Sequence, residues 1–317
     1  MKKSTYFFFV LPLVLLLSAC TLPGLGGGTG EDEVTVIGQT TTESQILTYI
    51  VHDMVEYYTD LDTDVIVNMG STTMANQAML QDDANIASSM YTGSVIAGIL
   101  NRDEIPTDPD EAFEVSREGF ENELDQKWYP TWGFANTYAF MTRAETAEEY
   151  GLETVSDLAD LSDELTAGVD QAWISKEGDG YQAFSEHYGF DFNNIFPMDI
   201  GLAYDALASG QVDVILGYST DGRISSYDLR LLEDDMLFFP SYDASPTANF
   251  SILEDQPIID DILLKLENTV SDEQMQQLNF LSDDYLLEPS IVAEIFLEEN
   301  DYFVDKEPIL TPEGGDE

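Results

Sequence analysis

Apolar residues near the start of the chain recur with two alternating spacings, which predict a strand followed by a helix. Residues 34–38 form a short apolar run typical of a buried strand. Over residues 46–58 the apolar positions return with the 3.6-residue period of an amphipathic helix that buries one face. Thr42 and Gln45, which lie between the two segments, have the spacing of a capping box. We therefore expect the helix to begin there.

The same order of elements repeats twice more in the first third of the chain. Strands are expected over 64–70 and 85–91, and each is followed by a helix that begins at Ser71 or at Thr92. Repeated strand and helix units of this kind predict an α/β fold with a doubly wound parallel sheet. Residues 101–130 are acidic and show neither period, so we expect them to be irregular.

A second set of alternating elements predicts a second α/β lobe. After residues 221–223 the pattern turns helical, with a capping box at Ser271 and Gln274 and a last helix from Pro289 to Glu299. We expect this C-terminal part to return to the first lobe. The elements expected in between are a strand over 136–142, a helix near 154–161, a strand over 166–170, a helix over 199–209 that Gly210 stops, and a strand over 212–218.

The N-terminus has the features of a secretory signal with a lipid attachment site. Two lysines precede an apolar run over 7–17, which is too short for a comfortable transmembrane helix and ends in Leu17-Ser-Ala-Cys20. We therefore assign residues 1–19 to a signal peptide and expect Cys20, the only cysteine, to carry the lipid. The alternative is an unmodified thiol after an ordinary signal peptide.

Acidic residues far outnumber basic ones, with 62 against 11 and a formal net charge of −51 at pH 7. Such a charge repels nucleic acid and anionic lipid. Because 44% of the residues are hydrophobic, the acidity is a property of the surface and does not indicate disorder. It either keeps the protein soluble in salty surroundings or steers a cationic solute. A Debye length of about 3 Å at 1 M salt removes long-range attraction and favours the first interpretation.

Polar and aromatic residues stand where strands end and helices begin, which is where open α/β sheets bind ligands. Gln39 follows one strand of the first set and Tyr91 ends another, Asn136 and Tyr138 open a strand of the second set, and Tyr218 ends a further one. Helix N-termini favour an anionic group, whereas tyrosine faces favour a cation that cannot hydrogen-bond. Together they suit a zwitterion, with simple packing of the rings as the alternative.

No pattern in the sequence points to catalysis, to a cofactor or to a metal. His52 and His187 are isolated, and the acidic run over 60–64 mimics a calcium loop but has Val65 where that loop needs glycine. The secretory signal, the two α/β lobes and the tyrosine positions lead us to expect a solute receptor. An extracytoplasmic enzyme and a structural or adhesive lipoprotein are the alternatives. The first lacks a reactive dyad, and the second does not account for aromatic residues at strand ends.

Eight short motifs follow one another from about residue 34 to residue 303. They are Ile37-Gly-Gln-Thr-Thr-Thr-Glu-Ser-Gln45, Gly70-Ser-Thr-Thr73, Tyr91-Thr-Gly93, Gly133-Phe-Ala-Asn-Thr-Tyr138, Asp179-Gly-Tyr181, Met198-Asp-Ile-Gly-Leu-Ala-Tyr204, Tyr218-Ser-Thr-Asp-Gly-Arg223 and Phe238-Phe-Pro-Ser-Tyr242. In order and spacing they resemble the glycine betaine/carnitine/choline-binding lipoproteins of osmoprotectant ABC importers.

The resemblance implies a two-lobed type II periplasmic-binding-protein fold that closes on its ligand, with a membrane permease and its ATPase as partners. It implies an aromatic box around a trimethylammonium head. Ser94 corresponds to a position that looks acidic in choline-restricted members of the family and carries a hydroxyl in members of broad specificity. By this resemblance, the serine favours broad specificity. Carried over by motif, the walls of the box are Tyr91, Tyr138, Tyr218 and Tyr242, and the other contact residues are Gln39, Ser94, Asn136 and Thr220.

These expectations divide the chain into an anchor and two lobes. Residues 20–33 are a flexible linker from the lipid anchor. Residues 34–131 and 222–305 are expected to form lobe I, residues 132–221 lobe II, and residues 306–317 a disordered tail. We expect a monomer without a cofactor, anchored to the outer face of the cytoplasmic membrane.

Overall fold

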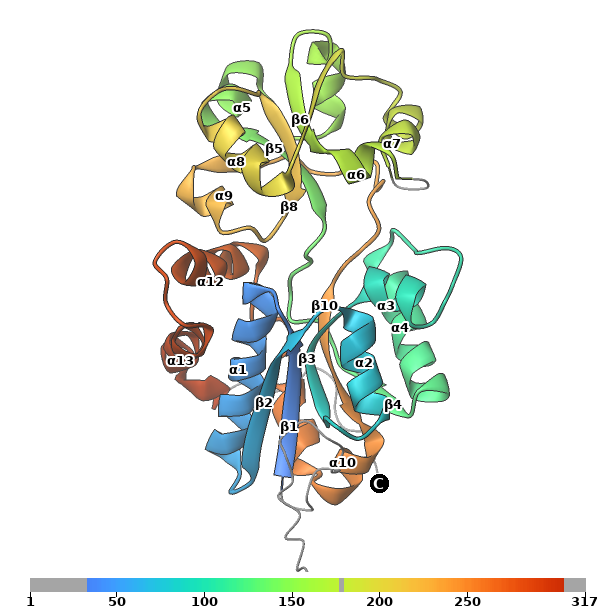
Figure 1. The fold of residues 1–317 in the computed structure, drawn as a ribbon, viewed down its shortest axis with the longest axis vertical. Coiled ribbons are helices and arrows are strands. Elements are labelled where there is room, and N and C mark those ends of the chain that lie inside the picture. The colour runs from blue at the N-terminus through green and yellow to red at the C-terminus, as the bar shows by residue number, and fades with distance from the viewer. Residues whose placement is uncertain (1–32, 177–179, 305–317) are drawn as a thin grey trace, which may run out of the picture.

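The computed structural model describes residues 33–176 and 180–304, which form two lobes joined by two crossing segments (Figure 1). The expected signal peptide over 1–19, the lipidated Cys20 and the tail over 306–317 lie outside the described residues. Each lobe contains a five-stranded sheet flanked by helices. The predicted two-lobed α/β class is therefore confirmed.

The sheet of lobe I has the strand order β2-β1-β3-β10-β4. β1 (Glu33–Gln39) pairs in parallel with β2 (Asp62–Met69) and β3 (Ile86–Tyr91), whereas β10 (Ala244–Asn249) runs antiparallel to β3 and β4 (Gln126–Trp128). The helices are α1 (Thr42–Tyr58), α2 (Thr72–Leu80), α3 (Thr92–Gly98), α4 (Pro109–Glu123), α10 (Phe250–Asp255), α11 (Ile258–Leu264), α12 (Asp272–Asp283) and α13 (Pro289–Glu299), followed by the 3-10 turn η2 (Asp301–Phe303).

The sheet of lobe II has the strand order β7-β6-β8-β5-β9. β6 (Thr166–Asp170) pairs in parallel with β7 (Asn194–Met198) and β8 (Val214–Tyr218), whereas β5 (Tyr138–Arg143) runs antiparallel to β8 and β9 (Leu229–Leu231). The helices are α5 (Ala144–Tyr150), η1 (Ser156–Leu161, a 3-10 helix), α6 (Gln171–Ile174), α7 (Tyr181–Tyr188), α8 (Ile200–Ala208) and α9 (Arg223–Ser226).

Both faces of each sheet are buried, because successive strand residues point to opposite sides. In β1, Val36 joins the apolar cluster beneath α1, and the next residue, Ile37, joins the cluster that contains Met79 of α2. In β5, Phe140 and Met141 divide in the same way between the two clusters of lobe II. Continuous apolar runs in these strands follow from burial on both faces.

Several predicted helix boundaries are confirmed. Ser71 caps α2 by accepting a hydrogen bond from Met74 N, and Ser271 and Gln274 form the expected capping box at the start of α12. Pro289 is the first residue of α13. At α1 the prediction is off by one residue, because the side chain of Thr41, and not that of Thr42, accepts from Ser44 N.

Residues 101–130 are not irregular as expected, since they contain α4 and β4. The side chain of Asp108 caps α4 by accepting a 3.0 Å hydrogen bond from Glu111 N, and Pro109 occupies the first turn, where its missing N–H costs nothing. The helix buries only a narrow face, and that face includes Ser116 and Gly119 beside Phe120. So few apolar residues do not produce a visible period.

The chain remains in lobe II beyond residue 221, where we expected it to leave. β9 pairs with β5, and Phe238 and Phe239 belong to the apolar core of lobe II. The chain crosses back to lobe I only at residues 240–243, and it then forms β10 in the middle of the first sheet. The expected helical pattern overlooked β10 because its sequence, Ala-Ser-Pro-Thr-Ala-Asn, has no apolar alternation.

Candidate functional site

A cavity of about 270 Å³ lies between the two lobes. Seven of the eight predicted contact residues line it, and the eighth, Thr220, lines a smaller cavity of about 130 Å³ beside it. Tyr218 and Asn136 border both cavities. Among the residues that the structure describes, the lining of the larger cavity is Gln39, Thr41, Tyr91, Ser94, Asn136, Tyr138, Lys176, Tyr218 and Tyr242.

Two of the four tyrosines belong to the sheet of lobe II and form a stacked pair. Tyr138 begins β5 and Tyr218 ends β8, and the antiparallel register places them directly opposite each other. Their ring centroids are 5.3 Å apart and their planes differ by 20°. Tyr218 is 40% exposed, so the pair presents an aromatic surface to the cleft.

The other two tyrosines come from lobe I and from the second crossing segment. Tyr91 ends β3 and is only 8% exposed, and Tyr242 lies just before β10 and packs against the apolar core of lobe I. Gly93 lets the Tyr242 ring approach the start of α3, because a Cβ atom at this position would lie 2.8 Å from that ring. The close approach of the Tyr242 ring therefore explains why the Tyr-Thr-Gly motif has a glycine at this position.

Gln39 supplies a hydrogen-bond donor at the cavity wall. Its backbone N donates to Ser44 Oγ over 2.7 Å, and its side-chain oxygen accepts a long contact of 3.5 Å from Thr72 Oγ1. Its amide Nε2 is buried and has no hydrogen-bond partner among the described residues. Burial of a donor without a partner is costly, so this position favours a ligand with an acceptor group.

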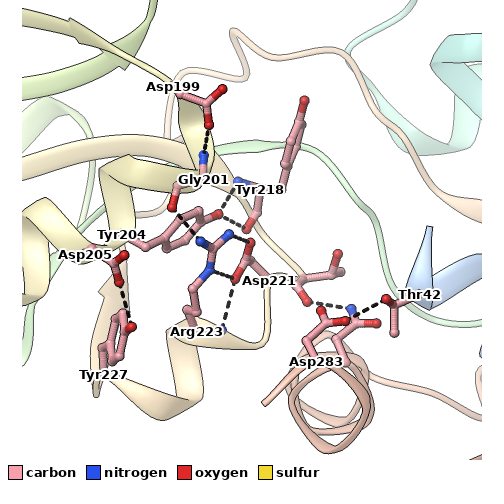
Figure 2. Close-up of polar contacts among 12 residues, drawn as sticks. Thr42, Asp199, Gly201, Tyr204, Asp205, Tyr218, Asp221, Arg223, Tyr227 and Asp283 are labelled. Carbon is pink, nitrogen blue, oxygen red and sulfur yellow. Dashed lines mark hydrogen bonds and ion pairs between the residues drawn. The ribbon is translucent and has the colours of Figure 1, made fainter. Parts of the chain in front are cut away.

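Tyr218 is held in place by a second tyrosine behind the sheet, as Figure 2 shows. The Tyr204 hydroxyl accepts a hydrogen bond of 2.8 Å from Tyr218 N and donates to Tyr218 O over 3.2 Å. The guanidinium of Arg223 lies 4.1 Å from the centroid of the Tyr204 ring. Arg223 also donates to both carboxylate oxygens of Asp221 and to Gly201 O. These contacts account for the order of residues in the motif Tyr218-Ser-Thr-Asp-Gly-Arg223.

Sequence reasoning missed two charged residues at the site. Lys176 lines the cavity with its Nζ 5.7 Å from the centroid of the Tyr138 ring. Over the parts of the chain that the structure describes, none of the residues that line this cavity is acidic, although the chain has 62 acidic residues. The lining therefore combines aromatic faces with one cation, an arrangement that suits a ligand carrying both signs of charge.

Glu43 is the second missed residue, and it is buried behind Tyr91. It is 3% exposed, and its Oε1 accepts hydrogen bonds of 2.5 Å from the Tyr91 hydroxyl and 3.0 Å from Asn136 Nδ2. Burial raises the pKa of this carboxyl above its usual 4.5, against the opposing effect of the surrounding polar groups. An acid in the first turn of a helix is common on protein surfaces, so its position in the sequence gave no signal of burial.

The histidines lie outside the cavity. His52 Nδ1 is 2.8 Å from Asp53 Oδ1 on the surface of α1, and His187 Nε2 is 2.9 Å from Met236 O. Over residues 33–176 and 180–304, no group of three or more His, Cys, Asp or Glu side chains is arranged to hold a metal ion. In the same ranges no helix is both long and apolar enough to cross a bilayer.

Two α/β lobes with a polar and aromatic cavity between them define the class of two-lobed solute-binding proteins. The chain belongs to the family of substrate-binding domains of ABC-type glycine betaine transport systems, whose model matches residues 32–299. The resemblance inferred from the eight motifs is therefore confirmed.

Three similar proteins place the chain among transport proteins. It is 48% identical over 307 residues, or 96% of this chain and 99% of the relative, to the carnitine transport binding protein OpuCC of Listeria monocytogenes. It is 32% identical to a glycine-betaine-binding protein of Pseudomonas aeruginosa, over 83% of this chain and 86% of the relative. A crystal structure of a glycine betaine/carnitine/choline ABC transporter superposes with a TM-score of 0.83 at 43% identity, over 85% of this chain and 99% of that one.

These relatives are substrate-binding components and not enzymes, which confirms the expectation of a non-catalytic protein. The protein is the substrate-binding component of an ABC transporter, so a small solute and a permease are its partners. Substrate-binding proteins of ABC importers act outside the cytoplasm, as expected.

Proposed function

We propose that the protein captures quaternary-ammonium osmoprotectants of the glycine betaine, carnitine and choline type and delivers them to the permease. The observation that carries this proposal is the cavity lined by Tyr91, Tyr138, Tyr218 and Tyr242, with no acidic residue among the described residues of its lining. A trimethylammonium head has no N–H to donate, so neutral aromatic faces suit it better than a carboxylate does. Carnitine and glycine betaine also appear in the names of the relatives described above.

Cation–π contacts supply the affinity in this proposal. Each aromatic face contributes about 0.5–2 kcal/mol to a desolvated cation. Four faces give several kcal/mol before the contacts to the carboxylate are counted. After the costs of ordering and lobe closure, we expect a net binding free energy of about −8 kcal/mol, which corresponds to micromolar affinity. The stacked Tyr138 and Tyr218 rings reach the cation by closure of lobe II.

The opposite end of the solute contacts polar groups. We assign its carboxylate to Gln39 Nε2, Asn136 and the ammonium of Lys176, with Ser94 as a further hydroxyl partner. Thr220 acts from the adjoining cavity and not in direct contact. Because choline has no carboxylate to contact Gln39 Nε2 and Lys176, we expect glycine betaine and carnitine to bind more tightly than choline.

Isothermal titration calorimetry tests the function directly. The protein without residues 1–20 is titrated with glycine betaine, carnitine and choline, and with proline as a non-methylated zwitterion. Micromolar binding of the methylated solutes and about a hundredfold weaker binding of proline are expected, because proline lacks the trimethyl head. No heat with any of the three methylated solutes would overturn the proposal.

Lys176→Met sharpens the assignment of the carboxylate end. Removal of a charge-assisted contact is expected to weaken glycine betaine about tenfold while choline binding is retained. Tyr285→Ala is the matched control, because Tyr285 is 65% exposed and does not line the cavity. Equal losses for glycine betaine and choline would instead assign Lys176 a general structural role.

Lipid attachment at Cys20 completes the proposal. Two acyl chains hold a protein firmly at a membrane, so the wild-type chain is expected in the membrane fraction of a Gram-positive host. Mass spectrometry is expected to find the lipid on Cys20 of the wild-type protein, and light scattering of the protein without residues 1–20 is expected to show a monomer. Wild-type protein without a lipid on Cys20 would contradict the anchor.

A further inference from the structure

Glu43 is a buried carboxylate that contacts a wall of the solute cavity without lining the cavity itself. We propose that Glu43 is a positioning residue, which holds Tyr91 and Asn136 in place and supplies a negative charge that favours a bound cation. This inference rests on the proposed function, because it concerns how the same cavity binds its solute.

The contacts of Glu43 come from parts of the chain that meet only in the folded protein. Tyr91 ends a strand of lobe I, and Asn136 lies on the first crossing segment, where its backbone N donates to Tyr242 O over 3.1 Å. One carboxylate oxygen thus binds a wall of the box and the segment that links the lobes. A change at Glu43 is therefore transmitted to three residues that line the cavity.

The smaller cavity lies where Glu43 meets lobe II and α12. Its lining includes Thr220 from the turn after β8 and Asn279 from α12. Two amides of α12 hold this turn, because Asn279 Nδ2 donates to Thr220 O and Gln276 Nε2 donates to Ser219 O, each over 2.8 Å. Glu43 therefore borders the contact between α12 of lobe I and the end of β8 in lobe II.

Two acceptor oxygens at this place have no donor among the described residues. They are Glu43 Oε2 and Asn279 Oδ1, both buried. Since Asn279 Nδ2 is already used, its oxygen cannot be exchanged for a donor by a flip of the amide. The nearby Thr220 hydroxyl and Asn279 amide favour the ionised carboxylate, whereas a proton on Glu43 Oε2 turns one of the two unpaired acceptors into a donor.

The two charge states therefore have opposite advantages. Burial favours the neutral carboxyl in the empty protein, and it raises the pKa of Glu43. A trimethylammonium head next to Tyr91 attracts the ionised form, because little solvent screens the two charges. By linkage, solute binding is expected to strengthen as the pH rises through the pKa of Glu43.

Other ionisable groups around Glu43 are already engaged. Tyr91 is the ionisable group in contact, and burial together with the Glu43 carboxylate raises its pKa, so it stays neutral. Asp221 and Asp283 border the smaller cavity, where Arg223 pairs with the first and Thr42 Oγ1 donates to the second over 2.6 Å. Figure 2 shows both contacts. The pH dependence is therefore assigned to Glu43.

Glu43→Gln separates charge from shape. The glutamine oxygen still accepts from Tyr91 and Asn136, and its NH₂ group supplies a donor for the smaller cavity, so the variant is expected to fold. Dissociation constants for glycine betaine and for choline, which has no carboxyl, are measured by calorimetry from pH 4.5 to pH 8. The affinity of the wild type is expected to fall about tenfold on acidification, which is the factor expected if solute binding lowers the pKa of Glu43 by about one. The variant is expected to bind with this weaker affinity at every pH.

Asp272→Asn is the matched control. Asp272 is a second partly buried carboxyl whose pKa burial raises, and its Oδ1 accepts from Ala135 N, next to Asn136. It does not line the cavity, so its variant is expected to retain the wild-type affinity and pH dependence. If Glu43→Gln does not fold, Tyr91→Phe tests the inference in its place. This variant keeps the ring but removes the donor to Glu43, so it is expected to weaken solute binding at neutral pH.

Each outcome has a separate meaning. Wild-type affinity and pH dependence in Glu43→Gln, or unchanged affinity in Tyr91→Phe if the glutamine variant does not fold, would overturn the inference. An equal loss of pH dependence in Asp272→Asn would also overturn it. Absence of binding by the wild-type protein would reject the proposed function instead.

Discussion

The walls that the two lobes contribute to the proposed aromatic box differ in how they are held. Tyr91 of lobe I is 8% exposed, belongs to the apolar core and donates its hydroxyl to a buried carboxylate. Tyr218 of lobe II is 40% exposed, and the Tyr204 hydroxyl holds its backbone while its ring stacks on Tyr138. The wall in lobe I is therefore part of the folding core, whereas the wall in lobe II is an exposed surface that solute binding is expected to bury.

This difference separates stability from affinity. A residue that is buried before the solute arrives contributes to the free energy of unfolding as well as to binding. A residue that is exposed contributes mainly to binding, because unfolding changes its environment little. Substitutions in the two walls are expected to reveal the contrast.

Tyr91→Ala is expected to have the largest effect. It removes a buried ring and leaves the Glu43 carboxylate without its shortest hydrogen bond, and by analogy with large core truncations the free energy of unfolding falls by about 3–5 kcal/mol. Solute binding should become undetectable. Urea denaturation and calorimetry measure the two effects. Unfolding at the wild-type urea concentration would show that Tyr91 is not a structural part of lobe I.

Tyr218→Ala is expected to affect affinity alone. Loss of one aromatic face costs up to about 2 kcal/mol, or a thirtyfold increase in the dissociation constant of glycine betaine. The free energy of unfolding should change by less than about 1 kcal/mol, because the ring is substantially exposed. The same two measurements apply. A loss of stability equal to that of Tyr91→Ala would remove the distinction between the walls.

Tyr204→Phe tests whether the backbone of Tyr218 must be held for its ring to act. The substitution deletes the hydroxyl that contacts both Tyr218 N and Tyr218 O but keeps the ring beneath Arg223. One lost hydrogen bond of this kind is worth about 1 kcal/mol, so affinity should fall about fivefold. Tyr227→Phe is the control, since its hydroxyl contacts only the surface residue Asp205. Equal effects of the two variants would contradict a positioning role for Tyr204.

The sequence predicted the part of the site that depends on strand ends. Tyr91, Tyr138 and Tyr218 could be placed near one another because period-2 and 3.6-residue patterns locate the ends of their strands. Glu43 and Lys176 could not, because burial of the first depends on the meeting of α1, the crossing segment and α12, and the second follows a helix of only four residues.

The fold shows the same division between local and tertiary causes. The repeated strands and helices of lobe I carry their own apolar periods and were predicted. β10 has no such period, yet all of its residues are buried because β3 and β4 flank it on either side. Where neighbours from distant parts of the chain decide burial, local pattern does not predict a strand.

His52→Gln is expected to have the smallest effect. His52 lies on α1, the same helix that carries Glu43, so this variant distinguishes the pH dependence of folding from the pH dependence of solute binding. The hydrogen bond to Asp53 is the main cause that raises the pKa of His52 above 6.5, so the protonated ring stabilises the folded state. This contribution is fully present below pH 6.5 and is lost as the pH rises through the higher folded-state pKa. Because the partners are solvent-exposed, the variant should be less stable by only about 0.5 kcal/mol at low pH and indistinguishable from wild type at high pH. Urea denaturation at both pH values measures the difference, while glycine betaine affinity should follow the wild-type pH profile. A changed binding profile in this variant would show that the two ends of α1 are coupled, and that the wall in lobe I responds to charges far from the cavity.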